Sequence, residues 1–464
     1  MLRTHMLGLP VAQHLPRHLL YDILKHFSSS LITAALNQFP WYLAHICSSW
    51  RAEFLSMHRM FWSYIYIDFP RPYSPTYKSE ADRCIEVLKM FLERNRGHSF
   101  SFEVAVGRGE KESTSRAQQI MDMLISASAR WRRATIDVDS HNIRKLPRIK
   151  GRVNQLESMV LIVGGPAIYQ TNNVDTFLDA PYLTRLTLHR LSKWNFSWER
   201  MTLLEFQILE AEEAARLPFI LSQAVQLETL IAPSYFPVRS AFITVPNLKH
   251  LDLGCIDLLS IITAPVLETL TTSMTVGGST RLPTEILESF LRRSRCQIQN
   301  LEVTGWLDSA TATDIFSHAP EITRLTLYHV PNVGRVLKLF NEMPTPKLAR
   351  LQSLSLIECQ LSRDEVDEVF KFVSLRKKRI KNAGFVIEKL QKLTFGKAGN
   401  EEGPNSARRE LRKHCKSYGI QYSAPSWSTP FWHAHDESQD PYDHSHDIYN
   451  QSSINENLRE SDED

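Results

Sequence analysis

A short leucine motif recurs along the middle of the chain and constrains the fold more than any other feature of the sequence. Five copies share the frame LxxLxL, usually with a proline two residues before the first leucine: PYLTRLTL (181–188), PNLKHLDL (246–253), PVLETLTT (265–272), PEITRLTL (320–327) and LARLQSLSL (348–356). Weaker copies have their first position at 156, 203, 227, 298 and 390, so that successive copies lie 19 to 39 residues apart. Self-similarity at such a period is typical of repeat proteins.

Each copy predicts one β-strand. Because alternate residues of a strand point to opposite faces, the last two leucines of the frame point into a shared interior. One unit cannot bury this apolar side alone, whereas stacked units form a parallel sheet and gain about 1.5 to 3 kcal/mol per large side chain buried. Polar residues between the leucines, such as Lys249, His250 and Asp252, would face outward along the concave side. The predicted fold class is therefore α/β, with an irregular leucine-rich-repeat solenoid over residues 151–423 that has a parallel concave sheet and helices on its convex face.

Helical periodicity between the strands supports this arrangement. The clearest helix is LSRDEVDEVFKFV (361–373), where Ser362 and Glu365 have the spacing of a capping box. PTEILESFLRRS (283–294) and TATDIFSHA (311–319) have similar apolar stripes. The stretch 408–423 predicts a closing helix, a turn at Gly419 and a last strand.

Residues 80–150 precede the first leucine copy and predict an atypical capping region. Two strands, at 98–106 and 129–138, flank a predicted helix at 116–130. Repeat arrays need such terminal units because the first true repeat would otherwise expose its core.

Composition narrows the class of protein. The 464 residues are 43% hydrophobic and 23% charged, which is ordinary for a globular chain, and the net charge of +3 is too small to argue for nucleic acid. No run of 18 apolar residues predicts a membrane span, and the N-terminal segment does not resemble a secretory signal. The six cysteines lack CxxC spacing, so we expect free thiols and an intracellular protein, cytoplasmic, nuclear or both.

Residues 424–464 are polar and acidic and predict a disordered tail. The pairs His433–His435 and His444–His446 have a spacing that could bind a metal, although a solvated tail explains them as well. The run RKKR (376–379) could be a nuclear import signal or the solvated end of a helix. Motifs for phosphate, dinucleotide or acyl-transfer chemistry are missing, and we expect no catalytic residue, cofactor or metal.

The N-terminal segment, residues 10–68, predicts a small three-helix module followed by a strand. Its first helix, LPRHLLYDILKHF (15–27), is apolar over more of its circumference than one core-facing stripe requires. Five large apolar side chains at about 2 kcal/mol each give about 10 kcal/mol, close to the roughly 4 to 15 kcal/mol cost of bringing two proteins together. Either the solenoid or a second chain must therefore cover this surface, and the second chain would need contacts from the following helices too.

This module resembles the F-box, whose pattern is LPxELLxxIF, then a VCxxWR segment, then a Pro-x-LW segment. The first helix matches the first part, ICSSWR (46–51) matches the second and Phe61-Trp62 matches the third. Together with the leucine copies, it resembles the large fungal class of F-box proteins with a leucine-rich carboxyl-terminal region. The residues that the resemblance assigns to partner binding are Leu15, Pro16, Leu19, Leu20, Ile23, Phe27, Ile46, Cys47, Trp50, Arg51, Phe61 and Trp62.

The resemblance implies a substrate receptor of a Skp–cullin–F-box ubiquitin ligase. The module would bind a Skp-type adaptor and through it a cullin, while the solenoid would hold a protein substrate that the sequence does not identify. No membrane or nucleic-acid partner is expected. The alternative is a leucine-rich interaction scaffold without a role in a ligase.

Overall fold

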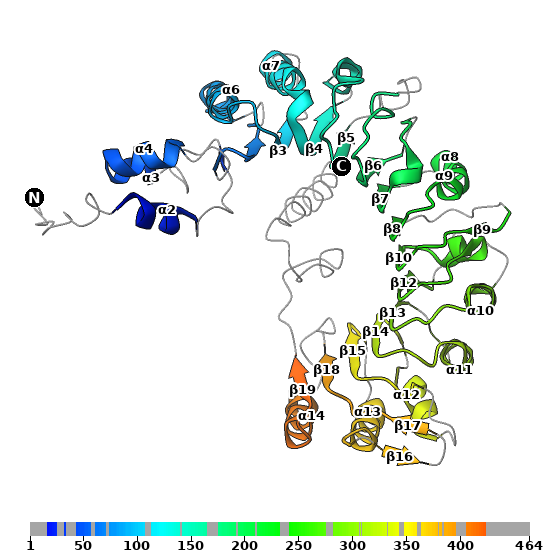
Figure 1. The fold of residues 1–464 in the computed structure, drawn as a ribbon. Coiled ribbons are helices and arrows are strands. Elements are labelled where there is room, and N and C mark those ends of the chain that lie inside the picture. The colour runs from blue at the N-terminus through cyan, green and yellow to red at the C-terminus, as the bar shows by residue number, and fades with distance from the viewer. Residues whose placement is uncertain are drawn as a thin grey trace, which may run out of the picture.

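A long parallel β-sheet forms the body of the computed structural model (Figure 1). The structure describes residues 16–25, 32–33, 43–56, 61–70, 74–106, 113–139, 142–164, 175–191, 194–208, 211–232, 241–274, 282–305, 307, 309–331, 333–342, 348–359, 363–378, 380–382, 385–395 and 405–423. Within these ranges, 15 strands follow one another in chain order, and each pair of neighbours is parallel. They are β1 (Ile32–Thr33), β2 (Tyr64–Asp68), β3 (Phe100–Val106), β4 (Trp131–Asp139), β5 (Ser158–Gly164), β6 (Arg185–Arg190), β7 (Leu203–Ile208), β8 (Thr229–Ala232), β10 (His250–Leu253), β12 (Thr269–Ser273), β13 (Asn300–Thr304), β14 (Arg324–Tyr328), β15 (Ser353–Ile357), β18 (Lys392–Phe395) and β19 (Gln421–Ser423).

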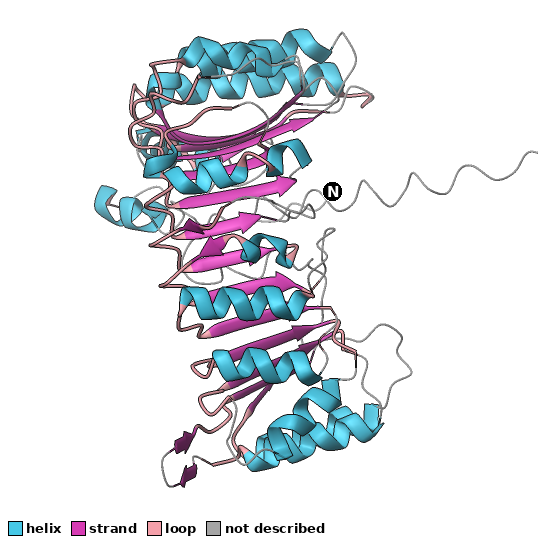
Figure 2. Ribbon diagram, turned by 90° about the vertical axis from the view of Figure 1, so that its right-hand side faces the viewer, coloured by secondary structure: helices cyan, strands magenta, loops and turns pink. Residues whose placement is uncertain are grey.

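Helices line the outer side of the curved sheet, so the predicted α/β class and solenoid-like stacking are confirmed (Figures 1 and 2). The α-helices are α2 (Arg17–Lys25), α3 (Leu43–Ile46), α4 (Ser48–Ser56), α6 (Tyr77–Arg94), α7 (Ser113–Ser126), α8 (Ala211–Ala214), α9 (Leu217–Gln223), α10 (Pro283–Ser294), α11 (Ser309–His318), α12 (Val333–Glu342), α13 (Arg363–Leu375) and α14 (Asn405–Ser417). Short 3-10 turns η1 (Ser128–Arg130), η2 (Asn142–Ile149), η4 (Trp198–Arg200) and η5 (Ile256–Ser260) replace helices in some units, and two small strand pairs, β9 (Ile243–Thr244) with β11 (Ile262–Thr263) and β16 (Ile380–Asn382) with β17 (Phe385–Ile387), lie outside the main sheet.

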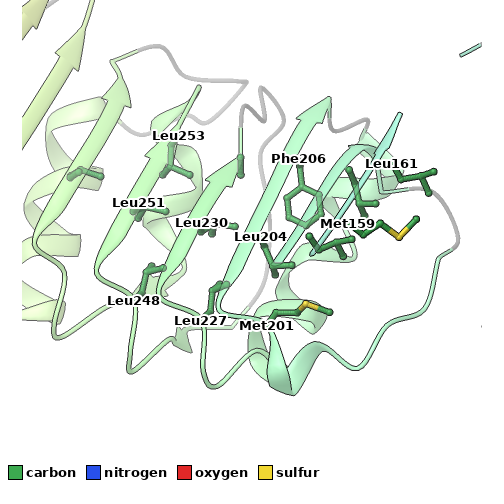
Figure 3. Close-up of a cluster of buried hydrophobic side chains, with 14 of the residues drawn as sticks. Met159, Leu161, Met201, Leu204, Phe206, Leu227, Leu230, Leu248, Leu251 and Leu253 are labelled. Atoms are coloured by element: carbon green, nitrogen blue, oxygen red, sulfur yellow. The ribbon is translucent and has the colours of Figure 1, made fainter. Parts of the chain in front are cut away.

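The leucines of the repeat frame form continuous columns inside the molecule (Figure 3). Strand pairing aligns Met159, Leu186, Leu204, Leu230, Leu251, Leu270, Leu301, Leu325, Leu354 and Leu393 from β5 to β18. All ten side chains are buried. Because each strand adds one more member to the same column, every unit covers the apolar side of its neighbour.

One copy of the frame was predicted in the wrong register. The sequence places Leu203, Phe206 and Ile208 in the frame, but β7 pairs Leu204 with Leu186. Met201 therefore takes the first position of the frame, where its side chain is 1% exposed.

The helices predicted from sequence are present. PTEILESFLRRS is α10, which begins at Pro283, where the lack of an amide hydrogen costs nothing. It ends at Arg295, whose left-handed φ of 51° closes the last turn. Helices α11, α13 and α14, the turn at Gly419 and strand β19 also match the predicted segments.

The predicted capping region is continuous with the repeats. Strands β3 and β4 and helix α7 form as expected, and strand pairing joins Phe102 to Ala134 and Ala134 to Met159, in line with the leucine column. The structure adds helix α6, which the sequence analysis did not predict. The predicted tail at 424–464 and Ser362 of the capping box lie outside the described residues.

None of the described helices is long and apolar enough to cross a membrane.

Candidate functional site

Three short helices, α2, α3 and α4, stand at the N-terminal end of the sheet, and we call them the head (Figure 1). The head presents apolar side chains to solvent: Leu19 is 43% exposed, Tyr21 is 44% exposed and Ile46 is 47% exposed. Pro16 at the start of α2 is exposed as well. Leu19 and Tyr21 lie two positions apart on α2 and therefore point to different sides of this helix, whereas Ile46 lies on α3.

The head is joined to the rest of the chain by a packed aromatic core. Phe54 on α4 packs against Phe61 at 4.9 Å and Trp62 at 5.6 Å between ring centroids. Trp62 in turn contacts Phe91 of α6 at 6.3 Å. This series of rings joins the head to the solenoid, so the two share one hydrophobic core.

The twelve predicted partner-binding residues therefore divide by burial. Pro16, Leu19, Ile46 and Arg51 are exposed, Ile23 and Cys47 are half-buried, Leu20, Trp50, Phe61 and Trp62 are buried, and Leu15 and Phe27 lie outside the described residues. The four buried side chains pack inside this chain and stabilise the head. Direct contacts with a partner would therefore come from the exposed residues of the predicted set. Tyr21 is a further exposed aromatic that the predicted set omits.

Asn95, at the end of α6, fixes the position of the head on the first solenoid units. Its side-chain amide donates a hydrogen bond to the Trp62 carbonyl oxygen at 2.7 Å. Its amide oxygen accepts a hydrogen bond from Arg130 Nη1 at 2.9 Å. Asn95 is fully buried, and its bond to Trp62 is shielded from water, whereas the bond from Arg130 is part-buried.

The concave face of the sheet is the second candidate surface, because the described helices lie on the other face (Figure 1). His250 and Asp252 face this side, as predicted, and alternate along β10 with the buried residues Leu251 and Leu253. Strand pairing places the concave residues in two parallel rows. One row contains Arg133, Arg185, His250, Arg324 and Lys392, and the other contains Glu103, Thr187, Glu205, Asp252, Glu302 and Thr394.

The acids at the centre of the second row lie in an environment that disfavours their charged form. Burial, reinforced by the nearby charge of Glu205, raises the pKa of Asp252 to about 7. Burial, reinforced by Asp252, raises the pKa of Glu302 to about 7. Both carboxyl groups are thus partly protonated at neutral pH, which ordinary surface carboxylates are not.

Other polar features of the chain have structural explanations. Arg376, the first residue of the RKKR run, is buried, and its guanidinium donates a hydrogen bond to the Leu348 carbonyl oxygen at 2.7 Å. Only Lys377 and Lys378 of that run are exposed, and Arg379 lies outside the described residues.

The six cysteines are free thiols, of which all but Cys47 are buried. Burial raises the pKa of Cys84 to about 12 and that of Cys296 to about 11, which keeps these thiols protonated. Across the described ranges, no group of three or more His, Cys, Asp or Glu side chains is placed to hold a metal ion.

Comparison with protein-family models gave no match, and comparison with curated proteins gave none either.

Proposed function

We propose that the chain is the substrate-recognition subunit of a Skp–cullin–F-box ubiquitin ligase. In this proposal the head binds a Skp-type adaptor, the adaptor connects to a cullin, and the solenoid holds a protein substrate. The chain contributes no catalytic residue. It raises the concentration of the substrate near a ubiquitin-loaded enzyme that the cullin brings into reach.

The observation that carries the proposal is the exposure of Leu19 and Ile46 on the head. A small helical module that had only to cap the solenoid would turn its large apolar side chains inward, as Leu20 and Trp50 are turned. Leu19 and Ile46 instead face solvent, at positions that the F-box resemblance assigns to adaptor binding. Burial of these side chains by an adaptor would contribute to the free energy of binding.

The number of exposed apolar contacts limits the strength of docking. Leu19 and Ile46 at about 2 kcal/mol each supply about 4 kcal/mol, at the lower end of the cost of association. Pro16 and Arg51, both exposed on the head, lie where the resemblance expects further contacts. The adaptor must therefore cover both α2 and the α3–α4 region to bind stably.

Reconstitution tests the proposal. The purified full-length chain is mixed with a purified Skp-type adaptor and a cullin, and the complexes are separated by gel filtration. A ternary complex supports the ligase role. An adaptor complex that excludes the cullin favours the scaffold alternative, and failure to bind the adaptor overturns the proposal.

Ubiquitin transfer is the second arm of the test. The reconstituted complex is supplied with ubiquitin, its activating and conjugating enzymes and the RING subunit. Ubiquitin attached to the chain itself or to a bound protein, and lost when the adaptor is left out, supports receptor function. Equal transfer with and without the adaptor contradicts it.

A further inference from the structure

The middle of the concave face has an electrostatic character of its own. Glu205 on β7, Asp252 on β10 and Glu302 on β13 lie in one row across the strands, and we call them the central acidic row. One strand separates each acid from the next, since β8 and β12 contribute Ile231 and Thr271 to the same row. Strands lie about 4.8 Å apart, which puts neighbouring acids about 10 Å from one another.

The described strands that carry this row, β7, β8, β10, β12 and β13, provide no Lys or Arg of their own. The neighbouring Arg324 on β14 directs its Nε to the Asn300 side-chain oxygen at 2.5 Å. Thr187 donates a hydrogen bond to Glu205 at 3.0 Å, which satisfies one oxygen without supplying a charge.

Apolar side chains lie beside the acids. Leu203 and Ile231 face the concave side and are half-buried. Lys and Arg have long aliphatic stems that pack along apolar surface while the charged ends reach polar partners. Acids beside apolar side chains therefore fit Lys or Arg better than they fit a small cation without an aliphatic stem.

We propose that the central acidic row binds a basic segment of a partner protein, with Lys or Arg side chains about 10 Å apart placed over Glu205, Asp252 and Glu302. This inference rests on the proposed function, because it names the kind of substrate that the solenoid would present for ubiquitin transfer. Two turns of an α-helix advance about 10.5 Å, so basic residues seven positions apart match the row.

The energetics favour a binding role for these acids. Burial and mutual repulsion raise the pKa of both Asp252 and Glu302 to about 7, so the folded chain retains charges that oppose its stability. A partner that supplies positive charge relieves this cost, because an opposite charge favours the ionised form of a carboxyl group. Perturbed carboxyl groups of this kind cluster at functional sites.

A direct binding experiment uses the full-length protein and a defined probe. The probe is a fluorescein-labelled Ala/Gln helical peptide with three lysines spaced seven residues apart, and its control peptide has glutamates in place of the lysines. Fluorescence anisotropy should show binding of the lysine peptide, at low salt, and none of the glutamate peptide. Preference for the glutamate peptide would overturn the proposal, because the row that contains Arg185, His250 and Arg324 would then be the binding surface.

Variants test whether the lysine peptide binds at the central acidic row. Asp252→Asn with Glu302→Gln keeps the size of both side chains and should lower affinity for the lysine peptide about tenfold or more, since hydrogen bonds between charged groups contribute about 1.5 to 3 kcal/mol. The matched control, Glu86→Gln with Glu93→Gln, removes the same number of carboxyl groups from exposed positions on α6. An equal loss of affinity in the two double variants would mean that peptide binding depends only on the net charge of the protein. This result would overturn the proposal.

The pH dependence gives an independent readout. The charged and titratable groups that face Asp252 are Glu205, Glu302 and, on its own strand, His250. Affinity should fall as pH drops from 8 to about 5.5, because Asp252 and Glu302 become protonated around pH 7. Asp252→Asn with Glu302→Gln retains His250, so an unchanged pH dependence in this variant would contradict the proposal.

The adaptor complex separates this inference from the proposed function. The double variant Asp252→Asn with Glu302→Gln should bind the adaptor as the parent protein does, because the head is unchanged. Loss of peptide binding with adaptor binding retained supports the acidic row. Peptide binding that persists unchanged in this variant overturns the acidic row even where the adaptor complex forms.

Discussion

The side-chain amide of Asn95 donates a hydrogen bond to the carbonyl oxygen of Trp62 at 2.7 Å, in a site from which water is excluded. This bond joins the end of α6 to the segment between the head and β2, next to the ring contact between Trp62 and Phe91. The position of the head on the solenoid therefore depends on one buried polar group as well as on aromatic packing.

Asn95→Ala should destabilise the junction between head and solenoid by about 1 to 3 kcal/mol, because it removes the buried hydrogen bond that the Trp62 carbonyl oxygen accepts from Asn95. Hydrogen exchange should accelerate first at amides next to the head, such as Ser101, which donates to Ser63. The control is Asn247→Ala, which removes an exposed amide bonded to Val225 and should change stability by less than about 0.5 kcal/mol. Equal effects of the two substitutions would show that Asn95 has no special role.

Helices α12 and α13 approach closely at Gly334. A Cβ atom at this position would lie 2.8 Å from the Glu365 Cα, and the Gly334 amide donates to the Glu365 carboxylate at 3.1 Å. Although alanine usually stabilises a helix relative to glycine, Gly334→Ala should cost about 1 to 3 kcal/mol here, because backbone must move. Urea denaturation measures the change in the free energy of unfolding. The control is Glu285→Ala, at an exposed position on α10. A more stable Gly334→Ala protein would contradict the close packing.

Asp252 makes the stability of the chain depend on pH. Its pKa is about 7 in the folded protein and close to 3.8 when unfolded, so the folded state binds more protons between these values. Stability should therefore fall as pH rises from about 4 to about 7. Asp252→Asn should raise the thermal midpoint at pH 7.5 and leave it nearly unchanged at pH 4. A midpoint difference that does not vary with pH would contradict the raised pKa.

The leucine frame predicted most of the sheet because each strand repeats the same buried pair of positions. The prediction was wrong at β7, because RMTLLEFQI (200–208) fits the frame in two ways. Apolar residues stand at 201, 204 and 206 and also at 203, 206 and 208. The choice depends on the neighbouring strand, which pairs Leu186 with Leu204. Helix α6 was missed even though Ala81, Cys84, Ile85 and Leu88 have helical spacing and are all buried.

The candidate surfaces were predictable only in part. The apolar excess of the first helix follows from its sequence, but the exposure of Leu19 and the burial of Leu20 depend on how α2 packs against α4. The central acidic row is invisible in the sequence because Glu205, Asp252 and Glu302 lie far apart along the chain. Only the strand register brings them into one row.

The affinity of the head for a Skp-type adaptor, measured by isothermal titration calorimetry, tests the central claim most directly. Leu19→Asp with Ile46→Asp changes only exposed side chains, so the protein should remain folded and lose at least about a hundredfold in affinity, as expected for two apolar contacts of about 2 kcal/mol each. The control Phe219→Asp, at a 62% exposed position on α9, should bind as the parent protein does. A folded Leu19→Asp, Ile46→Asp protein that binds the adaptor with unchanged affinity would contradict the account.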